Sequence, residues 1–315
     1  MIVAPIQDSK LNTHLDSLPK DEMLVFVMAN GRIRGALFHG TRFVNQMRAQ
    51  HRLGILETMV LGQASLCGAL LLPTMKGREY ITWRHEVNGP AQGFSVEADS
   101  QGFVRSYLFT DTIPVAEPLK NWDLAPFLGT GTMTMTTLHA GDKFPRVSSV
   151  EAKNKNIAQD LAWYFSQSEQ IQTAFNTGIQ LDSEGRVVGA GGLFLQMLPL
   201  TGGTKAREPQ AANADESLIE RMEQIFATLP SLGKYCSKGR HLEELLNSIF
   251  GEFEPSVALR RSVRYDCPCS KETYLTYIRS LPVDEVTDMK LHGPNPLHIT
   301  CRNCGSEYLI PVDEL

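Results

Sequence analysis

Four of the six cysteines lie near the end of the chain, in two close pairs. The pairs are Cys267-Pro-Cys269 and Cys301-Arg-Asn-Cys304, and 31 residues separate them. Structural zinc takes four thiolate or imidazole ligands in a tetrahedron, and two close pairs brought together across a hairpin can supply them. Gly305 after the second pair is typical of such a turn, because glycine lets backbone N–H groups turn toward the thiolates. We therefore predict one Zn²⁺ per chain, bound by Cys267, Cys269, Cys301 and Cys304.

This ligand set admits two interpretations of the zinc. With four thiolates the coordination is complete, so the metal does not activate water and serves either structure or regulation. A purely structural zinc ribbon is the commoner case. A redox switch is the alternative, because a C-x-C pair is unusual in a structural site and zinc-bound thiolates are deprotonated and react with oxidants. Oxidation would then release the metal, together with about 10 kcal/mol or more of folding free energy.

A third interpretation, a zinc ribbon that binds nucleic acid, conflicts with the charge of the segment. Residues 265–315 contain four Lys or Arg against eight Asp or Glu, and the whole chain has a formal net charge of -5. Binding to phosphates or to anionic membrane surfaces needs the opposite sign. We therefore expect neither nucleic acid nor membrane as a partner, and we expect Arg302 and Lys271 to neutralise part of the charge of the thiolates.

The elements before the cysteines predict an α+β fold. Two apolar runs at 24–28 and 33–38 flank Asn30-Gly31, a strong hairpin signal. Helical spacing follows at 42–52 and at 55–72, where one face should be buried. Further strands are predicted at 80–87, 93–98, 103–109, 131–138 and 146–150, a helix at 156–166, and a closing hairpin at 178–181 and 187–197. Strands and helices in separate runs favour α+β.

The chain of 315 residues divides into four parts by composition. Residues 1–20 are polar and irregular, and we expect a loosely attached extension. Residues 21–199 form the core domain, an antiparallel β-sheet with packed helices. Residues 200–255 are predicted to be a flexible, partly helical linker, with amphipathic helices at 218–228 and 240–250. Residues 256–315 form the small zinc-binding domain.

Several separate segments resemble one known family, the bacterial redox-regulated holdases, which are the thirty-three-kilodalton heat-shock chaperones. The likeness runs from about Asp21 to the end and includes both cysteine pairs, Val104-Arg-Ser-Tyr107, residues 162–170, Gly189-Ala-Gly-Gly192 and Tyr308. The resemblance implies a protein that is inactive when reduced and zinc-bound. It also implies that peroxide with heat, or hypochlorous acid, forms the disulfides Cys267–Cys269 and Cys301–Cys304, releases zinc and unfolds the linker. The exposed apolar surface of the core domain then holds unfolding client proteins without ATP, and the active form is a homodimer.

The runner-up hypothesis is an adaptor, insensitive to oxidants, whose zinc ribbon is only structural.

The two remaining cysteines lie outside the motif. Cys67 falls in an apolar helix and is expected to be a buried small hydrophobe. Cys236 lies between Lys234 and Lys238, which could lower the pKa of its thiol, although we favour an incidental role.

Catalytic and targeting signals are lacking in the sequence. The sequence does not support a catalytic Ser/His/Asp or Cys/His arrangement, so we predict a protein that is not an enzyme. The first residues show no signal-peptide pattern. The longest uncharged apolar run, from Ala64 to Thr74, is shorter than the roughly 18 residues that span a bilayer. We therefore expect a cytoplasmic protein, in which thiols stay reduced.

Overall fold

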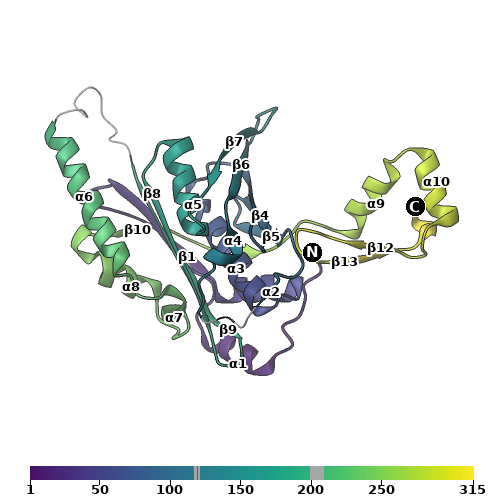
Figure 1. Ribbon diagram of the computed structural model, residues 1–315, viewed down its shortest axis with the longest axis horizontal. Helices are drawn as coiled ribbons and strands as arrows, with labels where there is room; N and C mark the ends of the chain where they lie inside the picture. Colours follow the sequence, from purple (N-terminus) through teal and green to yellow (C-terminus); the bar gives the residue numbers. More distant parts are fainter. Residues whose placement is uncertain (117–118, 120, 199–208) are drawn as a thin grey trace.

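The computed structural model describes residues 1–116, 119, 121–198 and 209–315. Two β-sheets enclose a central helix, helices cover the outer face of one sheet, and a small segment that carries the cysteine pairs protrudes at one side (Figure 1). The predicted α+β fold is confirmed.

The first sheet is antiparallel and has the strand order β10-β1-β2-β9-β8. Its strands are β1 (Glu22–Met28), β2 (Ile33–His39), β8 (Thr173–Leu181), β9 (Val187–Met197) and β10 (Ser256–Arg261). The predicted hairpin is β1–β2, in which Asn30 and Gly31 have φ angles of 54° and 78°. These left-handed positions suit Asn and Gly, which explains why the sequence signal was reliable.

The second sheet has the order β11-β5-β4-β3-β6-β7. Its strands are β3 (Glu79–Val87), β4 (Gly93–Asp99), β5 (Phe103–Leu108), β6 (Gly131–His139), β7 (Arg146–Ala152) and β11 (Arg264–Tyr265). All pairs are antiparallel except β11 with β5, where Arg264 is in register with Phe103. Residues 256–265, predicted with the zinc-binding part, therefore add one strand to each sheet of the core.

The central helix α3 (Ile55–Leu70) buries every residue except Ile55 and Gln63. The sequence predicted one buried face, but α3 packs between the two sheets and beside α2 (Thr41–His51). Together with a short 3₁₀ turn at Leu72–Thr74, the stretch Ile55–Thr74 is long and apolar enough to span a membrane, and 89% of its most apolar 18-residue window is buried inside the protein. It is the core helix of this fold.

Residues 1–20 were expected to be irregular, but the structure shows a helix there. They contain α1 (Ser9–Ser17), whose first turn is capped by the Asp8 carboxylate, which accepts a hydrogen bond from the Leu11 N–H. Leu11, Leu15 and Leu18 are buried in a small apolar cluster of their own. The polar composition hid this helix, because only the spacing of three leucines carries its apolar face.

The predicted amphipathic helices of the linker are present as α6 (Pro209–Ala227) and α8 (Leu242–Phe250), and α7 (Leu232–Cys236) lies between them. Residues 199–208 lie outside the described part of the chain, and α6 begins at Pro209, before the start at residue 218 that was predicted for this helix. Met222, Ile225 and Phe250 pack against Leu24 and Phe26 of the first sheet. The helices therefore cover an apolar sheet face.

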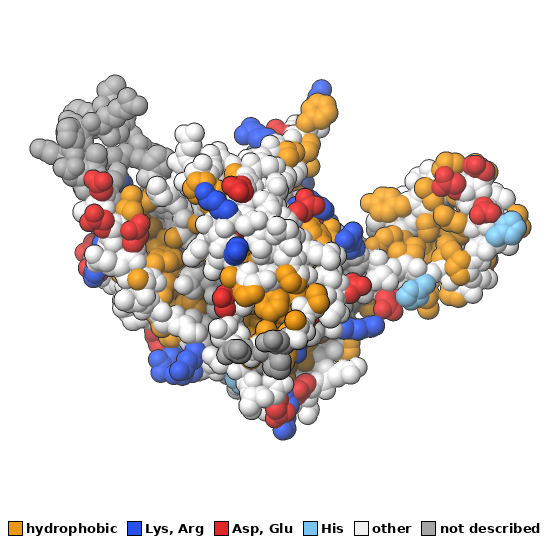
Figure 2. Space-filling model, viewed as in Figure 1, with side chains coloured by type: hydrophobic (Ala, Val, Ile, Leu, Met, Phe, Trp, Pro, Cys, Tyr) orange, Lys and Arg blue, Asp and Glu red, His pale blue; other side chains and the backbone are white. Residues whose placement is uncertain are grey.

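The protruding segment, here called the cysteine module (residues 266–315), contains α9 (Lys271–Arg279), α10 (Val283–His292) and the hairpin β12 (Leu297–Thr300) with β13 (Glu307–Ile310). Figure 2 shows apolar side chains on its visible face, and Val283 and Leu291 are 83% and 70% exposed. The core also contains the short helix α4 (Ala125–Leu128) and α5 (Ile157–Tyr164), which continues as a π-helical turn over Phe165–Glu169.

Acid should destabilise the core through His85 on β3. This ring is fully buried, stacks on Phe94 at 5.0 Å and lies 3.6 Å from the Asp160 carboxylate. Burial lowers the pKa of His85 to about 4, against the opposing effect of Asp160. In the unfolded chain His85 takes up a proton near pH 6.5, whereas in the folded protein it stays neutral until pH approaches 4. The free energy of unfolding therefore decreases as pH falls from 7 toward 4.

We expect the free energy of unfolding in urea to fall by up to about 2 kcal/mol between pH 7 and pH 5 from this group. His85→Leu should remove that part of the pH dependence, whereas His292→Leu, at an exposed position, should retain it. Equal pH profiles for the two variants would contradict this assignment.

Candidate metal centre

The two cysteine pairs meet at the base of the cysteine module. Cys301 and Cys304 lie in the turn between β12 and β13, and Cys267 and Cys269 lie between β11 and α9. The Sγ atoms of Cys267 and Cys301 are 3.8 Å apart, those of Cys269 and Cys304 are 3.4 Å apart, and all four lie within 4.8 Å of one another. The sequence prediction that these four side chains come together is confirmed.

This arrangement fits a tetrahedral thiolate site. Zn–S bonds of about 2.3 Å place the ligand sulfurs about 3.8 Å apart, close to the separations found here. A disulfide would need an S–S distance of about 2.05 Å, and all the cysteines, which lie within the described residues, are free. The four side chains are 0–9% exposed. The cluster can therefore hold a metal ion away from solvent.

The clustered thiols perturb one another's pKa values. Hydrogen bonds from Cys267 and Cys304 lower the pKa of Cys301, so one thiolate is stabilised by its neighbours. The hydrogen bond shared with Cys301 is the main cause that raises the pKa of Cys267 to about 11. Four thiolates so close together repel one another, and a bound divalent ion offsets that repulsion.

The basic group beside the sulfurs is Arg105, which the sequence analysis did not single out for this role. Its guanidinium donates to Cys267 Sγ at 3.1 Å and to the Tyr80 hydroxyl at 2.8 Å, and it pairs with Glu97. Arg105 lies on β5, and the pairing of β11 with β5 brings it to the cluster across 162 residues of sequence. Nothing local could have indicated this contact.

The two cations expected from the sequence have other partners. The Arg302 guanidinium lies over the Tyr107 ring, 4.7 Å from its centroid. Lys271 pairs with Glu314 at 2.6 Å. Proximity in sequence to the cysteines therefore did not predict the partners of these two side chains.

Gly305 shapes the second pair. Its φ of +68° is left-handed, and its N–H donates to the Cys301 carbonyl at 2.7 Å, whereas the sequence analysis expected N–H groups directed at sulfur. A Cβ at this position would lie 2.4 Å from the backbone oxygen of Gln50. Glycine therefore serves both the turn and the close approach of the module to α2.

Polar contacts join the module to the core at the same place. Gln50 Nε2 donates to the Cys304 carbonyl at 2.9 Å. The Tyr265 hydroxyl lies 2.8 Å from His51 Nε2 and 3.1 Å from the Asn303 carbonyl oxygen. The cysteine turns are thus docked on α2 and β11 through buried groups, where a hydrogen bond is costly to lose.

Cys67 and Cys236 stand apart from the site. Burial raises the pKa of both thiols to about 12. The possibility that lysines lower the pKa of Cys236 was wrong, because this side chain is only 2% exposed, with its sulfur close to Gly191 of β9. Both thiols are therefore poorly reactive in the folded protein.

Comparisons with known proteins agree with this fold and site. A family model described as Hsp33 protein matches residues 21–311. The 33 kDa chaperonin of Synechococcus sp. strain JA-3-3Ab is 30% identical over 98% of this chain and 92% of its own, and that of Geobacter sulfurreducens is 27% identical over 95% of each. The crystal structure of the 33 kDa chaperonin of Thermotoga maritima superimposes with a TM-score of 0.78 at 28% identity, covering 94% of this chain and 96% of that one.

Fold and site together define a chaperone with a cysteine cluster able to bind a metal. The chain belongs to the Hsp33 family, across nearly its whole length. Proteins of this family are chaperones and not enzymes, which confirms the prediction from sequence.

Replacement of Gly305 should release the module selectively. Gly305→Ala and Gly77→Ala both introduce a Cβ at a left-handed position, which costs about 1–2 kcal/mol each. Only at Gly305 does the new Cβ meet backbone, because nothing lies within 4 Å of the Cβ position at Gly77. We expect trypsin to cleave the reduced Gly305→Ala protein faster at Arg264 and Arg302 than the Gly77→Ala protein. Equal cleavage rates would show that the contact with Gln50 does not hold the module.

Proposed function

We propose that this protein is a redox-regulated, ATP-independent holdase. In the reduced state one Zn²⁺ is bound by Cys267, Cys269, Cys301 and Cys304, and the protein is inactive. The cluster of four buried sulfurs is the main observation that supports the proposal. Zinc would supply the charge that lets all four thiols ionise, and its bound thiolates are the groups that an oxidant attacks.

Oxidation joins the partners of each sequence pair. Each disulfide, Cys267–Cys269 and Cys301–Cys304, forms as two thiolates give two electrons to one hydrogen peroxide, which takes up two protons from the solvent and becomes two waters. The closest sulfurs, however, lie across the pairs, from Cys267 to Cys301 and from Cys269 to Cys304. Crossed disulfides would fasten the two turns to each other, whereas disulfides within each pair leave them free to separate. Support for the local pairing comes from the sequence spacing and the family resemblance.

Unfolding of the module would loosen the helices on the first sheet. The chain runs from α8 through β10 and β11 directly into Cys267, so the linker and the metal site share one short connection. The face beneath the helices includes Leu24, Phe26 and Leu193, all buried. Exposure of such a face would give an apolar surface for unfolding client proteins. We expect the active form to be a homodimer and its location to be the cytoplasm, where thiols are kept reduced.

One experiment tests metal and activity together. Reduced protein should contain about one zinc per chain. Peroxide at raised temperature should release the zinc, produce the two local disulfides in peptide mapping, and allow the protein to suppress aggregation of an unfolding client without ATP. Cys304→Ser should lose zinc, because three thiolates bind the metal more weakly than four. Cys67→Ser should behave as the wild type. Equal suppression by reduced and oxidised wild type would favour the adaptor with a structural zinc ribbon.

A further inference from the structure

Residues 1–18, here called the N-terminal strap, run from the cysteine module along the core to β9. In Figure 1 the N-terminus lies beside β13, and α1 lies at the opposite end of the strap, next to β9. The match to the family model begins at residue 21, so the strap lies outside the region shared with that model.

The first residues of the strap bond to the cysteine turns. The N–H of Ile2 donates to Ser306 Oγ at 3.1 Å, and Ser306 Oγ lies 3.2 Å from the Ile2 carbonyl oxygen. The backbone nitrogen of Met1 lies 2.8 Å from the Cys267 carbonyl oxygen. Ser306 Oγ also lies 3.2 Å from Cys304 Sγ. The strap thus contacts both cysteine pairs within one or two residues of the sulfurs.

Gln50 connects the strap, α2 and the second cysteine turn. Its side-chain N–H₂ donates to the carbonyl oxygens of Ile2 at 3.1 Å and Cys304 at 2.9 Å, while its Oε1 accepts from the N–H of Ala4. The side chain is 5% exposed. Both protons of the amide nitrogen are used, so loss of the strap would leave a buried donor unsatisfied.

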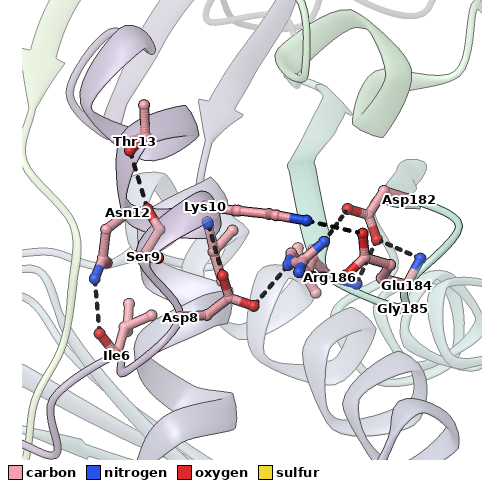
Figure 3. Close-up of polar contacts among 12 residues, drawn as sticks. Ile6, Asp8, Ser9, Lys10, Asn12, Thr13, Asp182, Glu184, Gly185 and Arg186 are labelled. Carbon is pink, nitrogen blue, oxygen red and sulfur yellow. Dashed lines mark hydrogen bonds and ion pairs between the residues drawn. The ribbon is translucent and has the colours of Figure 1, made fainter.

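The other end of the strap is fixed to the core. Asp8 pairs with Arg186 at 2.6 Å, and Lys10 pairs with Glu184 at 3.6 Å, both in the turn between β8 and β9 (Figure 3). Leu11, Leu15 and Leu18 provide the apolar anchor. The guanidinium of Arg42 on α2 donates to the Pro19 carbonyl at 2.7 Å and to the Leu15 carbonyl. An anchored α1 holds residues 1–4 near the module at high effective concentration.

We propose that the N-terminal strap is an intramolecular latch that fastens the reduced cysteine module to the core and sets how readily the module opens. The strap forms hydrogen bonds with the cysteine turns and with the buried Gln50, and α1 anchors its other end to the core. These contacts at both ends distinguish a latch from a tail that only covers the surface. The consequence for oxidation rests on the proposed redox function, but the latch itself acts on the reduced protein. Removal of the strap contacts should raise opening roughly tenfold, the effect of losing two or three hydrogen bonds.

The test uses reduced, zinc-loaded full-length protein and two ways of opening the latch. Deletion of residues 1–7 removes the contacts at the module and keeps α1. Gln50→Leu keeps the strap and the volume of the side chain but removes its hydrogen bonds. Thr13→Ala, on the exposed side of α1, is the control. Amide exchange is followed in residues 297–310 and, for comparison, in β6 and β7 (131–152), together with transfer of zinc to a chelator.

We expect exchange in 297–310 and zinc transfer to rise roughly tenfold in the deletion and in Gln50→Leu, with no change in 131–152 or in Thr13→Ala. Rates within about twofold of wild type in both variants would overturn the latch, even if peroxide still activates the wild-type protein. If the rates rise as expected but peroxide releases no zinc from the wild type, the latch stands and the proposed redox function fails.

Discussion

Four sulfur atoms within 4.8 Å of one another lie at the base of a segment whose helices bury few side chains. Among the residues of the cysteine module, all of them described, α10 buries none of its side chains and α9 buries only Ile278. Val283 and Leu291 face solvent, so these helices lack a core of the usual size. If the cluster binds zinc as proposed, folding of the module would draw on the free energy of metal binding, as in other small metal-dependent domains.

The chain segment just before Cys267 connects the cysteine module to both sheets of the core. Residues 256–265 form β10 on the edge of the first sheet and β11 on the edge of the second, and α8 ends just before β10. Arg105 and Tyr265 add polar contacts between the second sheet and the cysteine turns. Under the proposed function, unfolding of the module would loosen the two edge strands and then the helices that pack with Leu24 and Phe26. The short connection between α8 and Cys267 is the structural basis for that proposed coupling.

Local patterns in the sequence predicted most of the fold and the sulfur ligands. The Asn30-Gly31 turn, the strand alternation and the two cysteine pairs act over a few residues, so they can be read without knowledge of the fold. Contacts across long stretches of sequence could not be read in this way. Arg105 reaches Cys267 only because β11 pairs with β5, and the helix of residues 9–17 was hidden because its apolar face consists of three leucines in a polar segment.

Amide exchange after removal of zinc under reducing conditions tests whether the metal site controls the covering helices, because chelation separates the effect of the metal from that of the disulfides. We predict that protection is lost first in residues 271–310 and then in 209–250, while β3 (Glu79–Val87) stays protected. Continued protection of 209–250 at the level of β3 would contradict this prediction and would show that the metal site and the covering helices are not coupled.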